Sequence, residues 1–121
     1  MYQRGDVILV PFPFTDLSTS KRRPAIIISN EEVNTTGDVI IVMITSQDKR
    51  DTLQIEILPQ NITPGLPKKS YVRCHRIATI EVSMIIVKIG TANSDLLDKV
   101  ETKVHSLLLE DFPVQATASV F

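Results

Sequence analysis

Short runs of β-branched and aliphatic residues recur along the chain, separated by segments rich in proline, glycine, asparagine and aspartate. Runs of this length between turn-forming residues are typical of β-strands, and strands at this spacing favour a small barrel over a parallel α/β sheet. The chain is therefore expected to be mainly β. The strands predicted from this pattern are Val7–Val10, Ala25–Ser29, Val39–Thr45, Leu53–Ile57, Tyr71–Cys74 and Met84–Ile89.

Three segments between these strands carry turn signals. Pro11 and Pro13 end the first strand and open a loop that runs through Lys21. The segment Glu31–Asp38 has the composition of a turn, and Pro59–Lys69 holds three prolines and a glycine. These residues restrict or bend the backbone, so loops are expected in all three places.

The last element has the period of a helix. Apolar residues three and four positions apart form one stripe, and Asp95 and Asp98 favour the positive end of a helix that starts there. Either Asn93 or Ser94 can cap its first turn, and Asp111–Pro113 is expected to end it. The stripe consists of Leu96, Leu97, Val100, Val104, Leu107 and Leu108.

Length and composition narrow the class of protein. A chain of 121 residues with 43% hydrophobic residues suits one domain, which is expected to span residues 1–121. No apolar run reaches membrane-spanning length, and the N-terminus lacks the layout of a signal peptide. The single cysteine, Cys74, precludes an internal disulfide and is expected to be a small strand hydrophobe. A cytoplasmic protein without membrane contact is predicted.

The formal net charge of −1 argues against a protein that coats nucleic acid without selectivity, because such proteins are strongly basic. The charge is uneven, however. Residues 1–80 hold ten Lys and Arg against eight Asp and Glu, whereas residues 81–121 hold three against six. The predicted barrel is mildly basic, which is compatible with an anionic ligand and equally with ordinary surface scatter.

Arg23 is the first candidate for chemistry. Pro24 pushes the preceding residue toward extended geometry, so Arg23 is held where a polar loop enters a strand. A guanidinium fixed at such a junction is well placed to grip a phosphate, and a solvated loop charge is the alternative. Two histidines and one cysteine give no zinc spacing, and no Gly-rich phosphate loop exists. Neither a metal nor a cofactor is therefore expected.

The order of these motifs resembles the MazF/PemK/Kid family of toxins from bacterial toxin–antitoxin systems. The resemblance runs from Gly5 to about Leu109 and includes the terminal helix. It implies an SH3-like barrel, a homodimer, a cognate antitoxin protein as partner, and a metal-free endoribonuclease that cuts single-stranded mRNA at specific sequences to a 2′,3′-cyclic phosphate and a 5′-hydroxyl. The motifs that carry it are Gly5-Asp6-Val7, Arg22-Arg23-Pro24, Ile44-Thr45-Ser46-Gln47, Val72-Arg73-Cys74 and Ala78-Thr79-Ile80.

The resemblance also implies site residues. Arg23 matches the catalytic arginine of the family, Thr45 matches the threonine that works with it, and Arg73 matches the arginine of a Val-Arg-Cys-Asp motif. The aspartate of that motif is His75 here. A neutral imidazole accepts a proton near neutral pH, so His75 is a candidate base. A member with weaker activity or another cut site, and a bystander histidine on the barrel surface, remain as alternatives.

Further side chains are candidates for RNA binding or structure. Phe14 is expected to stack on a base or to meet an antitoxin, and His105, within the predicted helix, is expected to be structural. An acidic antitoxin segment is expected to contact Lys21–Arg23 and the Pro59–Lys69 loop. The polar and cationic candidates for an RNA path are Lys21, Arg22, Ser46, Gln47, Lys49, Arg50, Lys68, Lys69 and Arg76.

Two other functions stay open at this point. CcdB-type toxins share the fold and poison DNA gyrase without cutting RNA, and an inactive homologue that only binds an antitoxin is the third possibility. The set Arg23, Thr45 and Arg73 favours the nuclease, because a gyrase-binding protein does not need it.

Overall fold

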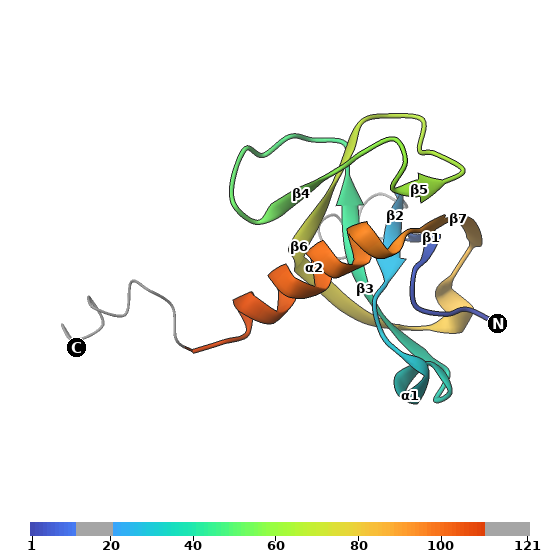
Figure 1. The fold of residues 1–121 in the computed structure, drawn as a ribbon. Coiled ribbons are helices and arrows are strands. Elements are labelled where there is room, and N and C mark those ends of the chain that lie inside the picture. The colour runs from blue at the N-terminus through green and yellow to red at the C-terminus, as the bar shows by residue number, and fades with distance from the viewer. Residues whose placement is uncertain (12–20, 111–121) are drawn as a thin grey trace.

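The computed structural model describes residues 1–11 and 21–110, which form a seven-stranded antiparallel sheet curled into an open barrel, with a long helix lying across it (Figure 1). The spatial order is β4-β6-β3-β2-β1-β7-β5. This confirms the mainly β, SH3-like small barrel with a C-terminal helix. The strands are β1 (Asp6–Pro11), β2 (Arg22–Ile27), β3 (Asp38–Thr45), β4 (Gln54–Ile57), β5 (Ile62–Thr63), β6 (Ser70–Glu81) and β7 (Val87–Ala92).

The two faces of the sheet bury two separate groups of apolar side chains, as alternation along a strand requires. On β3, Val42 and Ile44 pack with the helix α2 (Ser94–Leu107), whereas Ile41 and Met43 pack on the opposite face. The face away from α2 therefore carries its own core. That core comprises Ile8, Val10, Ala25, Ile27, Val39, Ile41 and Met43.

Strand β6 is much longer than the predicted Tyr71–Cys74, since it runs from Ser70 to Glu81 and pairs with both β3 and β4. Its register changes abruptly, because Val42 pairs with Ile77 while the next residue, Met43, pairs with Arg73. Three residues of β6 between these pairs have no partner on β3. Such a bulge bends the strand and re-aims its side chains. The sequence pattern missed the extension because the bulge interrupts the alternation.

Other strand boundaries also differ from the prediction. Strand β2 begins at Arg22 and ends at Ile27, rather than spanning Ala25–Ser29. The predicted strand Met84–Ile89 corresponds to β7 but was placed too early, because a 3₁₀ turn at Val82–Met84 precedes β7, which starts at Val87. Strand β7 extends instead through Gly90, where a Cβ would lie 3.0 Å from Ile62 Cγ2. Glycine thus permits the close approach of β5, a short strand inside the predicted Pro59–Lys69 loop.

The short helix α1 (Glu31–Asn34) occupies the predicted Glu31–Asp38 turn, capped by the Asn30 side chain. Neither this helix nor any other in residues 1–11 and 21–110 combines the length and hydrophobicity needed to span a bilayer.

Asn93, rather than Ser94, caps α2. Its Oδ1 accepts hydrogen bonds from Leu96 N at 3.0 Å and from Asn61 Nδ2 at 3.2 Å, and its own Nδ2 donates to Gln60 O at 3.2 Å. Four of the six residues of the predicted stripe are buried: Leu96, Leu97, Val100 and Val104.

The far end of the predicted stripe is wrong. Leu107 and Leu108 are 37% and 75% exposed. The helix ends at Leu107, and its last part extends beyond the strands (Figure 1). The predicted stop at Asp111–Pro113 lies outside the described residues.

Replacing Asn93 by alanine is expected to lower the free energy of unfolding by ~1–2 kcal/mol, since the variant loses the cap and the link to Asn61. Ser94→Ala, at the exposed neighbouring position, is the matched control and should change it by less than ~0.5 kcal/mol. Urea denaturation of the two variants and the parent checks this. Equal stability of the two variants would remove Asn93 as the cap.

Candidate active site

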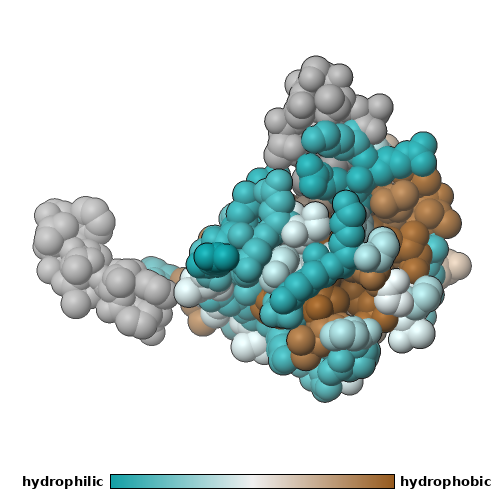
Figure 2. Space-filling view, turned by 90° about the horizontal axis from the view of Figure 1, so that it is seen from above, coloured by the Kyte–Doolittle hydropathy of each residue, from teal (hydrophilic) through white to brown (hydrophobic). Residues whose placement is uncertain are grey.

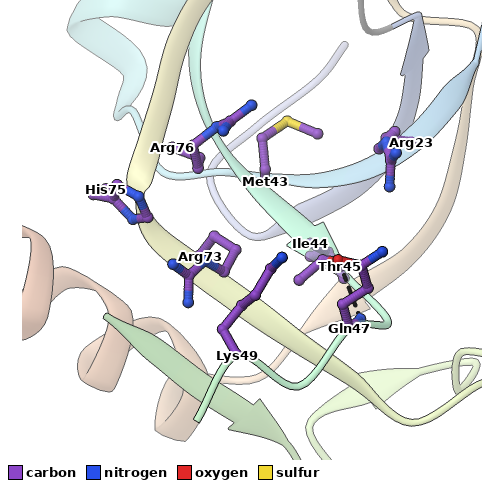
Figure 3. Close-up of a pocket in the computed structure, with 9 residues that line it drawn as sticks. All are labelled: Arg23, Met43, Ile44, Thr45, Gln47, Lys49, Arg73, His75 and Arg76. Carbon is purple, nitrogen blue, oxygen red and sulfur yellow. Dashed lines mark hydrogen bonds between the residues drawn. The ribbon is translucent and has the colours of Figure 1, made fainter. Parts of the chain in front are cut away.

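A pocket of about 540 Å³ opens on the face of the sheet away from α2, between strands β2, β3 and β6 and the loop that follows β3. Figure 3 shows Arg23 at one side of this pocket and His75 at the other, with Ile44 and Thr45 between them. All four residues expected to be catalytic therefore lie around one space. The nine lining residues are Arg23, Met43, Ile44, Thr45, Gln47, Lys49, Arg73, His75 and Arg76.

Strand register brings three of these residues together. Ala25 pairs with Met43, so the same antiparallel register continued by two residues sets Arg23 opposite Thr45. Met43 also pairs with Arg73 on its other side. Paired residues place their side chains on the same face of the sheet. The guanidinium groups of Arg23 and Arg73 and the hydroxyl of Thr45 therefore lie on the face that carries Ala25 and Met43.

The bulge in β6 supplies two further residues of the pocket wall. His75 and Arg76 are consecutive, and in a regular strand their side chains would point to opposite faces. Both line the pocket, since they lie among the three β6 residues without a partner on β3. Cys74, also in the bulge, points into the core against α2 instead.

Positive charge is concentrated in the pocket. Of the nine lining residues in the described part of the chain, four are Lys or Arg and none is a carboxylate, although the chain as a whole has a formal charge of −1. Figure 2 shows hydrophilic side chains over the left and centre of the face in view, and hydrophobic ones from its right side to its lower centre. A hollow lined with one sign of charge attracts a polyanion.

Arg23 presents a cation at the β2 side of the pocket. It is the second residue of β2 and is partly buried. Its backbone pairs with Val10 of β1, which holds the residue extended as Pro24 requires. Within residues 1–11 and 21–110 its guanidinium has no ion pair, so all of its N–H donors can face an anion.

Thr45 ends β3 with its hydroxyl oriented by the backbone. Its Oγ1 accepts a hydrogen bond from Gln47 N at 3.1 Å (Figure 3). The hydroxyl hydrogen is not used in this bond, so Thr45 can donate it to a phosphate oxygen.

Arg73 is held by a carboxylate that the sequence analysis did not single out. Its Nη1 and Nη2 donate to the two carboxylate oxygens of Asp51 at 2.8 and 3.1 Å. This bidentate hydrogen bond lowers the pKa of Asp51, with the positive charges of Arg73 and His75 as smaller causes. Asp51 therefore stays ionised at neutral pH.

The environment of His75 lowers its pKa below the ordinary value. Partial loss of hydration at the pocket wall is the largest cause, although the residue as a whole is exposed, and the positive charges of Arg73 and Arg76 act in the same direction. Asp51 opposes them. The imidazole is thus mainly neutral at pH 7, the form that can accept a proton.

The residues expected to bind RNA divide between the pocket and other surfaces. Gln47, Lys49 and Arg76 line the pocket. Lys68 and Lys69 line a separate pocket of about 490 Å³, where Lys69 Nζ lies 3.4 Å from a Glu56 carboxylate oxygen. Phe14 lies outside the described residues. The remaining four, Lys21, Arg22, Ser46 and Arg50, are exposed and do not line the pocket.

The other titratable groups fit structural roles. Cys74 is fully buried, and loss of hydration raises the pKa of its thiol to about 11, so it packs as a hydrophobe. His105 is exposed on α2, in the last turn before the C-cap. In the described part of the chain, no three His, Cys, Asp or Glu side chains cluster as metal ligands would.

Comparison with known proteins adds a family and a set of similar structures. Residues 3–108 match the profile of a family described as PemK-like, MazF-like toxin of type II toxin-antitoxin system. No match to a curated protein sequence was found.

Among solved structures, an endoribonuclease from Mycobacterial species in complex with its cognate antitoxin is similar, with a TM-score of 0.75 and 21% identity over 93% of this chain and 100% of that chain. MazF from Deinococcus radiodurans has a TM-score of 0.73 and 21% identity over 88% and 96% of the two chains. The Mycobacterium tuberculosis toxin MazF-mt6 has a TM-score of 0.70 and 19% identity over 88% and 99%. At these identities, the likeness concerns the fold.

Proposed function

Because the chain belongs to the PemK-like, MazF-like toxins of type II toxin–antitoxin systems, we propose that it is an endoribonuclease. It cuts single-stranded RNA without a metal ion and leaves a 2′,3′-cyclic phosphate and a 5′-hydroxyl. One observation supports this most: Arg23, Thr45, Arg73 and His75 line a single cationic pocket that is large enough for a nucleotide phosphate and its ribose. Two similar structures are of proteins named endoribonucleases.

The reaction needs a base, charge stabilisation and a proton for the leaving group. His75 takes the proton from the ribose 2′-hydroxyl as its oxygen attacks phosphorus. The guanidinium groups of Arg23 and Arg73 pair with the non-bridging oxygens as negative charge grows, and Thr45 donates its hydroxyl hydrogen. The bond from phosphorus to the 5′-oxygen then breaks, and that oxygen takes a proton from water in the open pocket.

A binding toxin that acts on gyrase is less well supported. A surface that only docks on a protein has no need of two guanidinium groups, a hydroxyl and an imidazole around one hollow, whereas cleavage uses each of them. Inhibition of DNA supercoiling by the purified protein, with RNA left intact, would favour that function. Antitoxin binding without either activity would favour an inactive homologue.

The proposed activity is tested by incubating the purified protein with single-stranded RNA in the presence of EDTA. The expected result is discrete fragments that carry a cyclic phosphate at one end and a free 5′-hydroxyl at the other. Intact RNA, or cleavage that appears only when a divalent cation is restored, would contradict it.

The proposal includes an antitoxin. Similar toxins have been solved in complex with their cognate antitoxins. An acidic segment would meet favourable charge at the cationic pocket and at Lys21–Arg23, with the Pro59–Lys69 loop as the second contact. Charge reversal in both regions that leaves antitoxin affinity unchanged would exclude this surface.

A homodimer is the proposed assembly, and it makes a separate prediction. Several large apolar side chains stay exposed on β6, the 3₁₀ turn and the start of β7, which is typical of a surface that another chain covers. They are Ile77, Met84, Ile86 and Val87, between 38% and 46% exposed. Light scattering at micromolar concentration should give twice the mass of one chain, and Val87→Lys should shift it toward the monomer. A monomeric parent would contradict the dimer.

A further inference from the structure

Asp51 holds one of the pocket's guanidinium groups from outside the pocket. It lies in the loop between β3 and β4, and it is not among the residues that line the hollow. Its two carboxylate oxygens accept from Arg73 Nη1 and Nη2 at 2.8 and 3.1 Å. The Arg73 side chain is only 12% exposed, whereas that of Asp51 is 40% exposed. The carboxylate therefore reaches a largely enclosed cation from the solvent side.

The geometry of this pair leaves Arg73 able to bind a second anion. A guanidinium carries five N–H donors, and the contact with Asp51 uses one hydrogen on each of the two Nη atoms. The Nε hydrogen and the two other Nη hydrogens remain. One planar group can thus be fixed by Asp51 along one edge while it donates to a phosphate along another.

The loop that carries Asp51 is itself tied to the bulge of β6. Leu53 N donates to Asp51 Oδ1 at 3.0 Å, and Leu53 O accepts from Cys74 N, the residue before His75, at 2.9 Å. Gln54 closes the other side of the loop, since its Oε1 accepts from Lys49 N at 2.8 Å and its Nε2 donates to Asp48 at 2.7 Å. Asp51 is therefore held in a fixed place relative to the strand that presents Arg73 and His75.

We propose that Asp51 is a positioning residue for RNA cleavage, which fixes the plane of the Arg73 guanidinium so that its remaining donors meet the scissile phosphate. This inference rests on the proposed function. Asp51 does not touch the RNA in this account and acts only through Arg73. Without Asp51, Arg73 keeps its charge and its place on β6 but loses its fixed orientation. Stabilisation of the transition state is then weaker, whereas RNA binding is little changed.

The test compares kcat and KM of RNA cleavage for the parent and three variants. Asp51→Asn should lower kcat by ~10–100-fold, the range for a misplaced charge donor, with KM changed by less than ~3-fold. Asp51→Glu keeps a carboxylate and should recover part of the loss. Glu101→Gln is the matched control. Glu101 lies on α2 and also pairs with an arginine, Arg4, but neither residue lines the pocket. It should cleave at the parent rate.

Three results would overturn the inference. Parent-like kcat in Asp51→Asn would show that the pair does not orient Arg73 for the reaction. A fall in KM with unchanged kcat would show that Asp51 instead competes with RNA phosphate for Arg73. In the double variant Asp51→Asn, Arg73→Ala, kcat should be no lower than in Arg73→Ala alone. A further fall in kcat in the double variant would also refute the inference. If the parent protein leaves RNA intact, the proposed function is wrong. If the parent cleaves RNA and Asp51→Asn cleaves it equally well, only the inference about Asp51 is wrong.

Discussion

Replacing His75 by alanine is expected to lower kcat for RNA cleavage by ~10²–10⁴-fold, the range for the loss of a general base. His75 lines the pocket from the bulge in β6. Among the described lining residues, the other titratable ones are Lys and Arg, which are poor bases at neutral pH. The substitution removes an exposed side chain, so the fold should survive.

The pH dependence of cleavage distinguishes a base from a binding residue. The neutral imidazole is the active form, so the rate falls as pH drops through the pKa of His75. Because burial and the charges of Arg73 and Arg76 lower this pKa, the acid limb should lie below the ordinary value of 6.5. His75→Ala should flatten the limb. His75→Asp should restore part of the rate and move the limb to lower pH, since a carboxylate stays ionised there.

A parent-like rate and an unchanged acid limb in His75→Ala would make the histidine a bystander. The chemistry would then depend on Arg23, Thr45 and Arg73 alone. Circular dichroism of each variant provides the control for folding.

Arg23→Ala is the second substitution with a large expected effect, a loss of ~10²–10³-fold in cleavage, as for removal of one preorganised charge donor. Arg23 lies opposite Thr45 in the continued register, and its guanidinium has no ion pair within the described residues, so its loss removes a charge donor from the pocket wall. Arg23→Lys keeps the charge without the fork of donors and should recover only part of the rate.

Arg4→Ala is the matched control for Arg23. It also removes an arginine, but one that pairs with Glu101 on α2 and does not line the pocket. Cleavage should be unaffected in that variant. If folded Arg23→Ala also cleaves at the parent rate, Arg23 has no part in the reaction.

The open barrel could be predicted because its strands are short apolar runs with clear ends. The register between strands could not, since it depends on contacts far apart in sequence. This is why β6 was predicted too short: alternation breaks at Cys74, where three residues bulge. The predicted strand Met84–Ile89 was placed too early for a related reason, because the 3₁₀ turn before β7 and a strand have similar apolar composition.

The candidate site was easier to predict in its residue types than in its arrangement. Arg23, Thr45, Arg73 and His75 were singled out by motif, and they do line one pocket. Asp51 was missed, because a carboxylate in a polar loop looks like any solvated charge. Its contact with Arg73 depends on the loop's own hydrogen bonds, and no signal in the sequence indicates them. Lys68 and Lys69 were grouped with the site by charge alone, but they line a different pocket.

One measurement tests the central claim most directly. The claim is that this pocket cleaves RNA through the ribose 2′-hydroxyl without a metal ion. Once the cut site is mapped, two oligonucleotides that differ only in a 2′-deoxy group at the scissile position are incubated with the protein in EDTA. The all-ribose strand should be cut to a cyclic phosphate and a 5′-hydroxyl, while the substituted strand should stay intact at that bond. Equal cleavage of the two strands would contradict the claim.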